Sequence, residues 1–415
     1  MIKQLFTRDF TIFIIGSLVC SIADVAMSFV MSVIVYEETA STLLSGIFFA
    51  TSFLPNILVP LLFSPWVDNN YKKPFLVGCD LLIGLCYFVG YFVFGKIGFN
   101  YFFFMVFDLV CGCIGAIYQI AYQAYLPCLV EEELMQKGYT IFSMTYPICS
   151  IIFAPIASYV YEHVGVSPLL LCVGILMMIV GLLDISLKEK GIKKDVSSYS
   201  NRFTAYIGEI KYAIGYLRKE KGLNKWYYER AISDGLGSIR GLMRTAFFVS
   251  NPALGLTLYS FLNAAAFAGR MIGSIFNFNH KYENSVKAKL TLAVYTIYEV
   301  VDTTIIFLPY YMMLIIDSIA GFLGVNTFVL RESAIINYIP DEDRGKINSL
   351  LSIRSCIFQS IASVFGGYLG DIFGIKTTML MCGVVGMLAI FFFVFLNLDG
   401  INKIFTYRKP KVNIE

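Results

Sequence analysis

The sequence predicts an all-α integral membrane protein in which twelve transmembrane helices form two bundles of six. Of its 415 residues, 57% are hydrophobic and only 15% are charged, whereas soluble domains carry roughly 25% charged residues. Twelve apolar runs follow one another along the chain, each close to the roughly 20 residues that a spanning helix needs. A basic segment without a spanning run separates the sixth run from the seventh. Six runs on either side of this segment predict two related bundles.

The runs define the expected spans and the domain organisation. The expected spans are 10–36, 42–66, 75–95, 100–125, 138–161, 167–187, 225–249, 253–276, 288–308, 310–333, 346–369 and 375–397. They divide the chain into an N-terminal bundle (1–187), a basic linker (188–224), a C-terminal bundle (225–402) and a tail (403–415).

The first span resembles a signal peptide only at its start. Lys3 and Arg8 precede the apolar run, as they would in a signal peptide. The run extends from Phe10 to about Tyr36, which is too long for the core of a cleaved signal and long enough to cross a membrane. We therefore expect a spanning helix here.

The linker contains an amphipathic pattern. Apolar side chains recur at helical spacing, whereas the charged ones fall elsewhere on the helix. Two placements remain open, at the cytoplasmic membrane surface or packed against the inner face of a bundle. The apolar residues are Phe203, Tyr206, Ile207, Ile210, Ile214 and Leu217.

Basic residues gather in alternate loops, which predicts the orientation of the chain. The opposite set of loops contains only Lys96 and Lys376. Both termini and the linker are therefore expected in the cytoplasm, with the spans in the inner (plasma) membrane. The cytoplasmic set comprises Lys3, Arg8, Lys72, Lys73, Lys137, the linker, Lys281, Lys287, Lys289, Arg344, Lys346, Lys403, Arg408, Lys409 and Lys411.

Composition argues against several other functions. The net charge of +3 is too small to suggest nucleic acid binding. With two histidines, and ten cysteines that show no zinc-ligand spacing, we expect no metal site. No glycine loop for nucleotide phosphates occurs, so we expect neither an enzyme nor a cofactor.

Several polar residues fall inside the predicted spans, where ionisable groups are costly and normally face a cavity or a partner. Arg240 and Arg244 share a helix face, so each needs a partner elsewhere, whereas Arg230 and Asp234 can pair with each other. The buried acids could bind protons or substrate, or form fixed ion pairs. The candidate cavity residues are Asp24, Asp108, Gln119, Gln123, Arg240, Arg244, Asp317 and Asn326.

Other charged residues favour a structural role. Glu299 and Asp302 are expected to reach a neighbouring helix, and Arg354 to brace the bundle interface. Arg270, Arg331 and Glu332 are expected near the cytoplasmic gate.

The loop between the second and third spans, Ser64-Pro65-Trp66-Val67-Asp68-Asn69-Asn70-Tyr71-Lys72-Lys73, resembles a signature of the major facilitator superfamily. That signature is Gly-x-Leu-x-Asp-Arg-x-Gly-Arg-Lys, so Ser64, Asn69 and Tyr71 depart from it. The resemblance implies that Asp68, near the N-terminus of the eleventh helix, helps to close the cytoplasmic side. Lys72 and Lys73 could serve only as positive-inside anchors.

Two further motifs bear on this resemblance. Ala154-Pro155-Ile156-Ala157-Ser158 is similar to the Gly-Pro-x-x-Gly-Gly motif of family members that export by antiport, with small residues in place of the glycines. In contrast, the fourth span has Asp108-Leu109-Val110-Cys111-Gly112 where many members have Arg-x-x-x-Gly. This departure puts any inherited proton pathway in doubt.

Within the family, the chain looks most like the macrolide-efflux and enterobactin-exporter group. It shares the spacing from Val67-Asp68 to Lys72-Lys73 and a linker helix that ends with the segment Leu217–Leu223. The resemblance implies that helices 1, 4, 7 and 10 line a cavity, and that a monomer exports a small amphipathic molecule in exchange for protons. A nutrient importer and a non-transporting scaffold or sensor remain alternatives.

Overall fold

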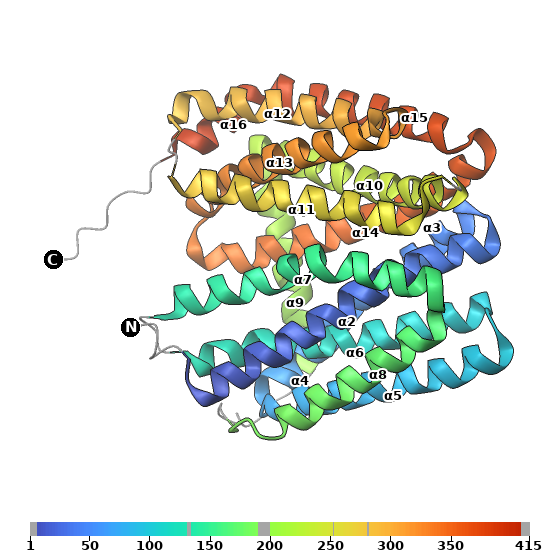
Figure 1. Ribbon diagram of the computed structural model, residues 1–415. Helices are drawn as coiled ribbons and strands as arrows, with labels where there is room; N and C mark the ends of the chain where they lie inside the picture. Colours follow the sequence, from blue (N-terminus) through green and yellow to red (C-terminus); the bar gives the residue numbers. More distant parts are fainter. Residues whose placement is uncertain (1–5, 131–133, 190–199, 252, 280–281, 408–415) are drawn as a thin grey trace. The chain divides into compact units, whose positions relative to one another are not determined.

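The computed structural model describes residues 6–130, 134–189, 200–251, 253–279 and 282–407, and the regular structure within them is helical (Figure 1). Helices α2 to α8 form the first half of the chain. They are α2 (Arg8–Thr39), α3 (Thr42–Ser52), α4 (Leu54–Asn69), α5 (Lys73–Ile97), α6 (Tyr101–Leu129), α7 (Met135–Val164) and α8 (Val166–Asp184).

The second half contains the linker helix and the remaining spans. Its helices are α9 (Ser200–Lys219), α10 (Lys221–Ser250), α11 (Gly255–Asn279), α12 (Asn284–Thr304), α13 (Tyr310–Tyr338), α14 (Asp341–Phe373), α15 (Ile375–Ala389) and α16 (Leu398–Thr406). Short 3₁₀ and π segments follow α12 and join α15 to α16. The all-α fold class with twelve transmembrane helices predicted from the sequence is confirmed.

Ten helical segments within the described residues are long and apolar enough to cross a membrane. Helices α10 and α11, which match the seventh and eighth predicted spans, are not among these ten. For α10 the reason is its composition, since Glu229, Arg230, Asp234, Arg240 and Arg244 all lie within it. A helix this polar needs partners for its charges inside the protein.

The structure differs from the sequence expectation at the second span, at the end of the sixth and at the start of the eleventh, among other places. The second span is broken into α3 and α4 at Phe53, just before Pro55, whose ring cannot continue a regular helix. The sixth helix ends at Asp184 rather than at 187. The eleventh begins at Asp341 rather than 346, because Pro340 has an extended backbone and occupies the N-cap position.

Contacts divide the chain into two compact units. Unit 1 comprises Met1–Ala40, Phe48–Thr204 and Phe248–Ala264, and unit 2 comprises Ser41–Ile47, Ala205–Phe247 and Ala265–Glu415. The units follow the two halves of the chain, except that each includes a short segment from the other half. The sequence-based domain limits remain predictions.

Small residues allow the helices of unit 1 to approach closely. Helix α5 packs along α8, where Gly84 lies against Gly174 and Met178, and Gly181 lies against Leu81. A Cβ on Gly181 would lie 2.7 Å from a methyl group of Leu81, so a larger residue would force the two helices apart. Helix α2 packs on both α7 and α8.

The linker helix α9 packs on unit 2, which decides between the two placements left open by its sequence. Ala213 and Leu217 are fully buried in a core that includes Leu223, Trp226 and Ile404. The Tyr212 hydroxyl also donates a hydrogen bond to Asp343 Oδ2 at 3.2 Å. The apolar face of this half of α9 is therefore covered by protein. The side chains of Phe203, Tyr206 and Ile207 lie outside the described residues.

A carboxylate from another helix caps each of two helix N-termini. In unit 2, Asp371 at the end of α14 accepts hydrogen bonds from the Thr42 and Leu43 N–H groups at 2.7 and 3.2 Å, and from the Ser41 and Thr42 hydroxyls. In unit 1, Glu162 at the end of α7 accepts from the Leu256 and Thr257 N–H groups at 2.5 and 3.1 Å. Unpaired N–H groups and the helix dipole both favour an anion at this position.

We predict that Asp371→Ala destabilises the protein by about 1–2 kcal/mol, because a lost helix cap costs about this much. The measurement is the apparent melting temperature of the purified protein in detergent. Glu38→Ala, which removes an exposed carboxylate in the last turn of α2, is the control and should leave the melting temperature unchanged. Equal melting temperatures for Asp371→Ala and wild type would contradict the capping role.

Candidate functional site

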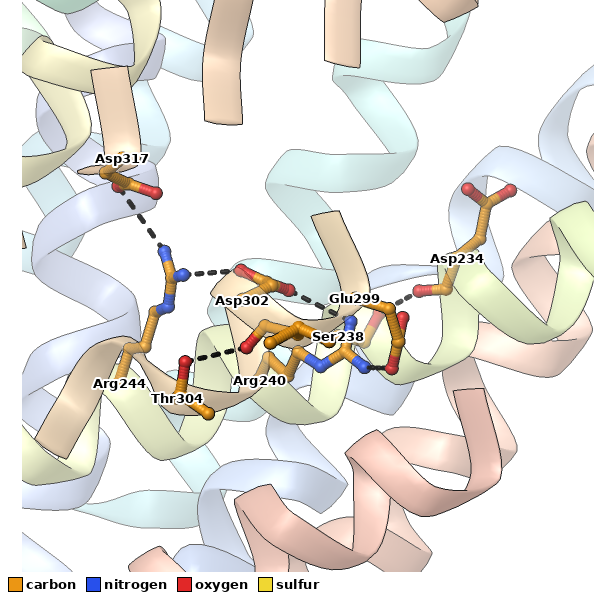
Figure 2. Close-up of polar contacts among 9 residues, drawn as sticks. Asp234, Ser238, Arg240, Arg244, Glu299, Asp302, Thr304 and Asp317 are labelled. Atoms are coloured by element: carbon orange, nitrogen blue, oxygen red, sulfur yellow. Dashed lines mark hydrogen bonds and ion pairs between the residues drawn. The ribbon is translucent and has the colours of Figure 1, made fainter. Parts of the chain in front are cut away.

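The most extensive buried charge network lies in unit 2, where two arginines of α10 meet three carboxylates (Figure 2). Arg240 Nη1 lies 3.0 Å from Asp302 Oδ2, and Arg240 Nη2 donates to Glu299 Oε1. Arg244 donates to the other carboxylate oxygen of Asp302, and its Nη1 lies 3.5 Å from Asp317 Oδ2 on α13. Asp302 therefore bridges the two guanidinium groups.

Because these side chains are buried, each charge depends on its ion-pair partner. The side chains of Arg240 and Glu299 are 4% exposed, and those of Arg244 and Asp302 are 11% and 12% exposed. An ion in such surroundings has lost most of its hydration and needs a close partner of opposite sign. These five residues (Arg240, Arg244, Glu299, Asp302 and Asp317) carry two positive and three negative formal charges. The next guanidinium within electrostatic range of Asp317 is that of Arg270, which is exposed.

The sequence analysis predicted part of this network. The expectation that Arg240 and Arg244 each need a partner from another helix is confirmed. Glu299 and Asp302 were assigned only to a neighbouring helix, and they prove to be the main partners. A signal was present, because Glu299 and Asp302 are three residues apart and Arg240 and Arg244 four apart, so each pair shares one helix face.

A second network connects the other end of α10 with α13 and α14. Arg230 lies 3.8 Å from Asp234, as predicted, and 2.5 Å from Glu332 of α13. Asp234 Oδ2 also accepts from the Ser355 hydroxyl at 2.5 Å. Arg331 binds the Tyr295 hydroxyl at 2.9 Å. These contacts brace unit 2 internally.

Arg354 also lies within unit 2, over the ring of Tyr228, and its Nη1 lies 3.3 Å from Asn224 Oδ1 on the same α10 helix. Asn326 is buried and donates to the Phe322 carbonyl at 2.6 Å, where α13 packs against Gly273 of α11. Both residues thus contribute to helix packing within their unit.

The candidate acids of unit 1 are arranged differently. Asp24, in the middle of α2, is exposed, and Asp108 of α6 accepts from the Ser52 hydroxyl at 2.5 Å. Within the described residues neither carboxylate pairs with a lysine or arginine. Gln119 and Gln123, lower on α6, are both exposed. Among the described residues, Asp24 and Asp108 therefore have no counter-ion.

The sequence analysis did not identify two further acids of unit 1. Asp80 of α5 and Asp184 of α8 are almost completely buried, with 0% and 2% exposure, and have no cationic partner in the part of the chain described. In the sequence, each is a single acid near the end of a predicted span. Such an acid resembles a residue at the membrane–water interface. Only the pairing of α5 with α8 brings them together.

The loop and helix-5 motifs have local structural roles. Lys72 Nζ donates to the Val67 and Asn70 carbonyls at 2.6 and 2.8 Å and so closes the turn between α4 and α5. Lys73, half-buried, begins α5. The Asp68 side chain lies outside the described residues, and the Arg270 guanidinium lies over the Phe267 ring. The gate role of these residues remains a prediction.

In α7, the small residues around Pro155 face the protein interior. Ala154, Ala157 and Ser158 are buried, and the Ser158 hydroxyl donates to the Ala154 carbonyl at 2.8 Å. Ala154 packs in a small core with Val25 of α2. The motif therefore supports close contact between α2 and α7.

Comparison with known proteins shows a family match over most of the chain. A sequence model described as the Major Facilitator Superfamily matches residues 13–301 and 289–411. No curated protein sequence matches the chain.

Solved structures share the fold at low sequence identity. One is a bacterial homologue of the human lysosomal transporter Spinster, in an inward-facing and unoccupied conformation (13% identity, TM-score 0.67, 99% of each chain covered). Others are the nucleoside transporter NupG (11%, 0.64, 97% of this chain and 100% of that chain) and an inward-facing bacterial homologue of the iron transporter ferroportin (14%, 0.64, 93% and 99%).

We predict that Asp302→Asn is far more damaging than Asp317→Asn. Asp302 contacts both guanidiniums, whereas Asp317 contacts only Arg244, at 3.5 Å. Removing one partner of a buried ion pair costs about 3–5 kcal/mol. The measurement is the yield of monodisperse protein in size-exclusion chromatography and its melting temperature. Equal losses for the two variants would show that Asp302 is not the bridge on which the network depends.

Proposed function

Because the chain belongs to the Major Facilitator Superfamily, we propose that it is a proton-coupled secondary transporter that exports a small amphipathic molecule by alternating access. Family membership makes it a multi-pass membrane transporter. Proton coupling, export and the substrate class belong to the proposal, as do action as a monomer and placement in the inner membrane with cytoplasmic termini.

The observation that carries the proposal is that neither Asp24 nor Asp108 has a counter-ion among the described residues. A carboxylate within a membrane span is costly, and it becomes tolerable when it gains a proton or a cationic ligand. Asp24 is exposed, so a proton or a substrate can reach it without rearrangement of the core. Among the described residues, the Ser52 hydroxyl lies in hydrogen-bonding range of Asp108, and a hydroxyl suits either protonation state of a carboxyl group.

The charges of unit 2 have a different task in this proposal. Arg240, Glu299 and Asp302 are each satisfied by a close partner, so they serve as a fixed brace between α10 and α12. Asp317 is held more loosely, at 3.5 Å from Arg244. It is the member of the network best placed to exchange its partner for a proton or a substrate cation.

The direction and substrate class rest on sequence resemblance together with packing. The small residues Ala154, Ala157 and Ser158 beside Pro155 keep α7 close to α2, as the related antiporter motif would require. The neighbours named above transport different classes of substrate by their descriptions. The fold alone therefore selects none, and the test must survey several.

The test is substrate-dependent proton movement in proteoliposomes, with macrolides, siderophores, lipophilic cations, nucleosides and ferrous iron as the panel. We expect one class to drive proton flux in exchange for substrate. Asp24→Asn should reduce the flux by roughly tenfold or more, since coupling between two sites typically amounts to 5–150-fold. Glu38→Gln, an exposed acid near the end of the same helix, should transport normally.

The outcomes separate the alternatives. Proton flux in the same direction as substrate would indicate import by symport. Full activity of Asp24→Asn would remove Asp24 from the coupling mechanism. Substrate uptake without proton movement would contradict proton coupling.

A further inference from the structure

Asp80 and Asp184 form an unusual pair in the core of unit 1. They come from α5 and α8, which pack along each other, and their carboxyl groups lie within hydrogen-bonding range of one another. Both side chains are shielded from solvent, with 0% and 2% exposure. Helix α2 closes the third side, where a Cβ on Gly16 would lie 3.3 Å from Asp184 Oδ1.

Among the described residues, the surroundings supply weak hydrogen-bond donors and no positive charge. The Cys20 thiol donates to Asp80 Oδ1 over 3.9 Å, and its sulfur lies 3.7 Å from the Tyr118 hydroxyl. Asp80 Oδ2 and Asp184 Oδ1 are buried and receive no hydrogen bond from another group in the described structure. The titratable groups among the described residues that face the pair are Cys20 and Asp24 of α2, Cys79 of α5, and Tyr118, Tyr122 and Tyr125 of α6. All of these are neutral or negative.

Two ionised carboxylates cannot be stable in this environment. They would repel each other at short range, both side chains are shielded from bulk solvent, and no cation among the described residues offsets the repulsion, to which Asp24 would add a third negative charge. A single proton removes the conflict, because a protonated carboxyl donates a hydrogen bond and its ionised partner accepts it.

A metal ion is a poorer occupant than a proton. Within the described residues, no group of three or more His, Cys, Asp or Glu side chains is arranged to hold a metal. Two carboxyl oxygens are sufficient for a shared proton, whereas a divalent cation requires more oxygen ligands.

We propose that Asp80 and Asp184 form a proton-binding site in which the two carboxyl groups share one proton. The site is separate from Asp24 and Asp108 and joins α5 to α8. It does not depend on the proposed transport function, because it follows from the burial of the two carboxyl groups, their pairing and the absence of cations among their described neighbours.

The experiment is infrared spectroscopy of the purified protein in lipid bilayers, in H₂O and D₂O and without any substrate. We expect a protonated carboxylic acid band that shifts in D₂O and disappears in both Asp80→Asn and Asp184→Asn. Glu38→Gln, which removes an exposed carboxylate, should retain the band. Difference spectra that show only carboxylate bands lost in the two aspartate variants would overturn the proposal.

Two additional measurements test whether the result reflects misfolding of a variant and whether a cation occupies the site. Asp184→Glu keeps an acid at the site, so it should keep the band at a shifted position even if an asparagine variant fails to fold. The spectrum should also be the same in sodium and choline buffers. Loss of the acid band in sodium would identify a bound cation in place of the proton and overturn the proposal.

Discussion

Charge compensation within the membrane is the constraint on which this structure depends. In unit 2, opposite charges lie close together. Asp302 lies between Arg240 and Arg244, and Glu299 pairs with Arg240. Desolvation of five ionised groups costs more than any one contact returns, so the network is stable only as a whole. This explains how α10 can carry the guanidinium groups of Arg240 and Arg244 in buried positions.

Unit 1 meets the same constraint by different chemistry. Its four membrane-depth acids, Asp24, Asp80, Asp108 and Asp184, have no cationic partner among the described residues, and the groups around the two buried ones are thiols and phenols. Protons are the simplest way to balance such a set. The two units therefore differ in how their charges are compensated: ion pairs brace unit 2, whereas the acids of unit 1 lack cationic partners among the described residues.

The sequence was most informative where one property decides the structure. Hydropathy located the spans to within a few residues, and the spacing of Arg240 and Arg244 correctly indicated partners on other helices. It was least informative where two distant segments must meet. Asp80 and Asp184 lie far apart in the chain, so only the packing of α5 on α8 reveals the pair. For Glu299 and Asp302 the sequence indicated a neighbouring helix but not their pairing with Arg240 and Arg244.

The two helix caps show that both halves of the chain use the same arrangement, which is hardly visible in the sequence. In the sequence, the segment from Gly269 to Ser274 weakly resembles the first loop. In the structure, the fifth helix of each half ends in a carboxylate that caps the second helix of the other half. Asp371 of α14 caps α3, and Glu162 of α7 caps α11. Because both caps use equivalent helices, the two halves share one architecture. The contrast between the ion-paired charges of unit 2 and the acids of unit 1, which lack cationic partners among the described residues, is then a chemical difference built on related frameworks.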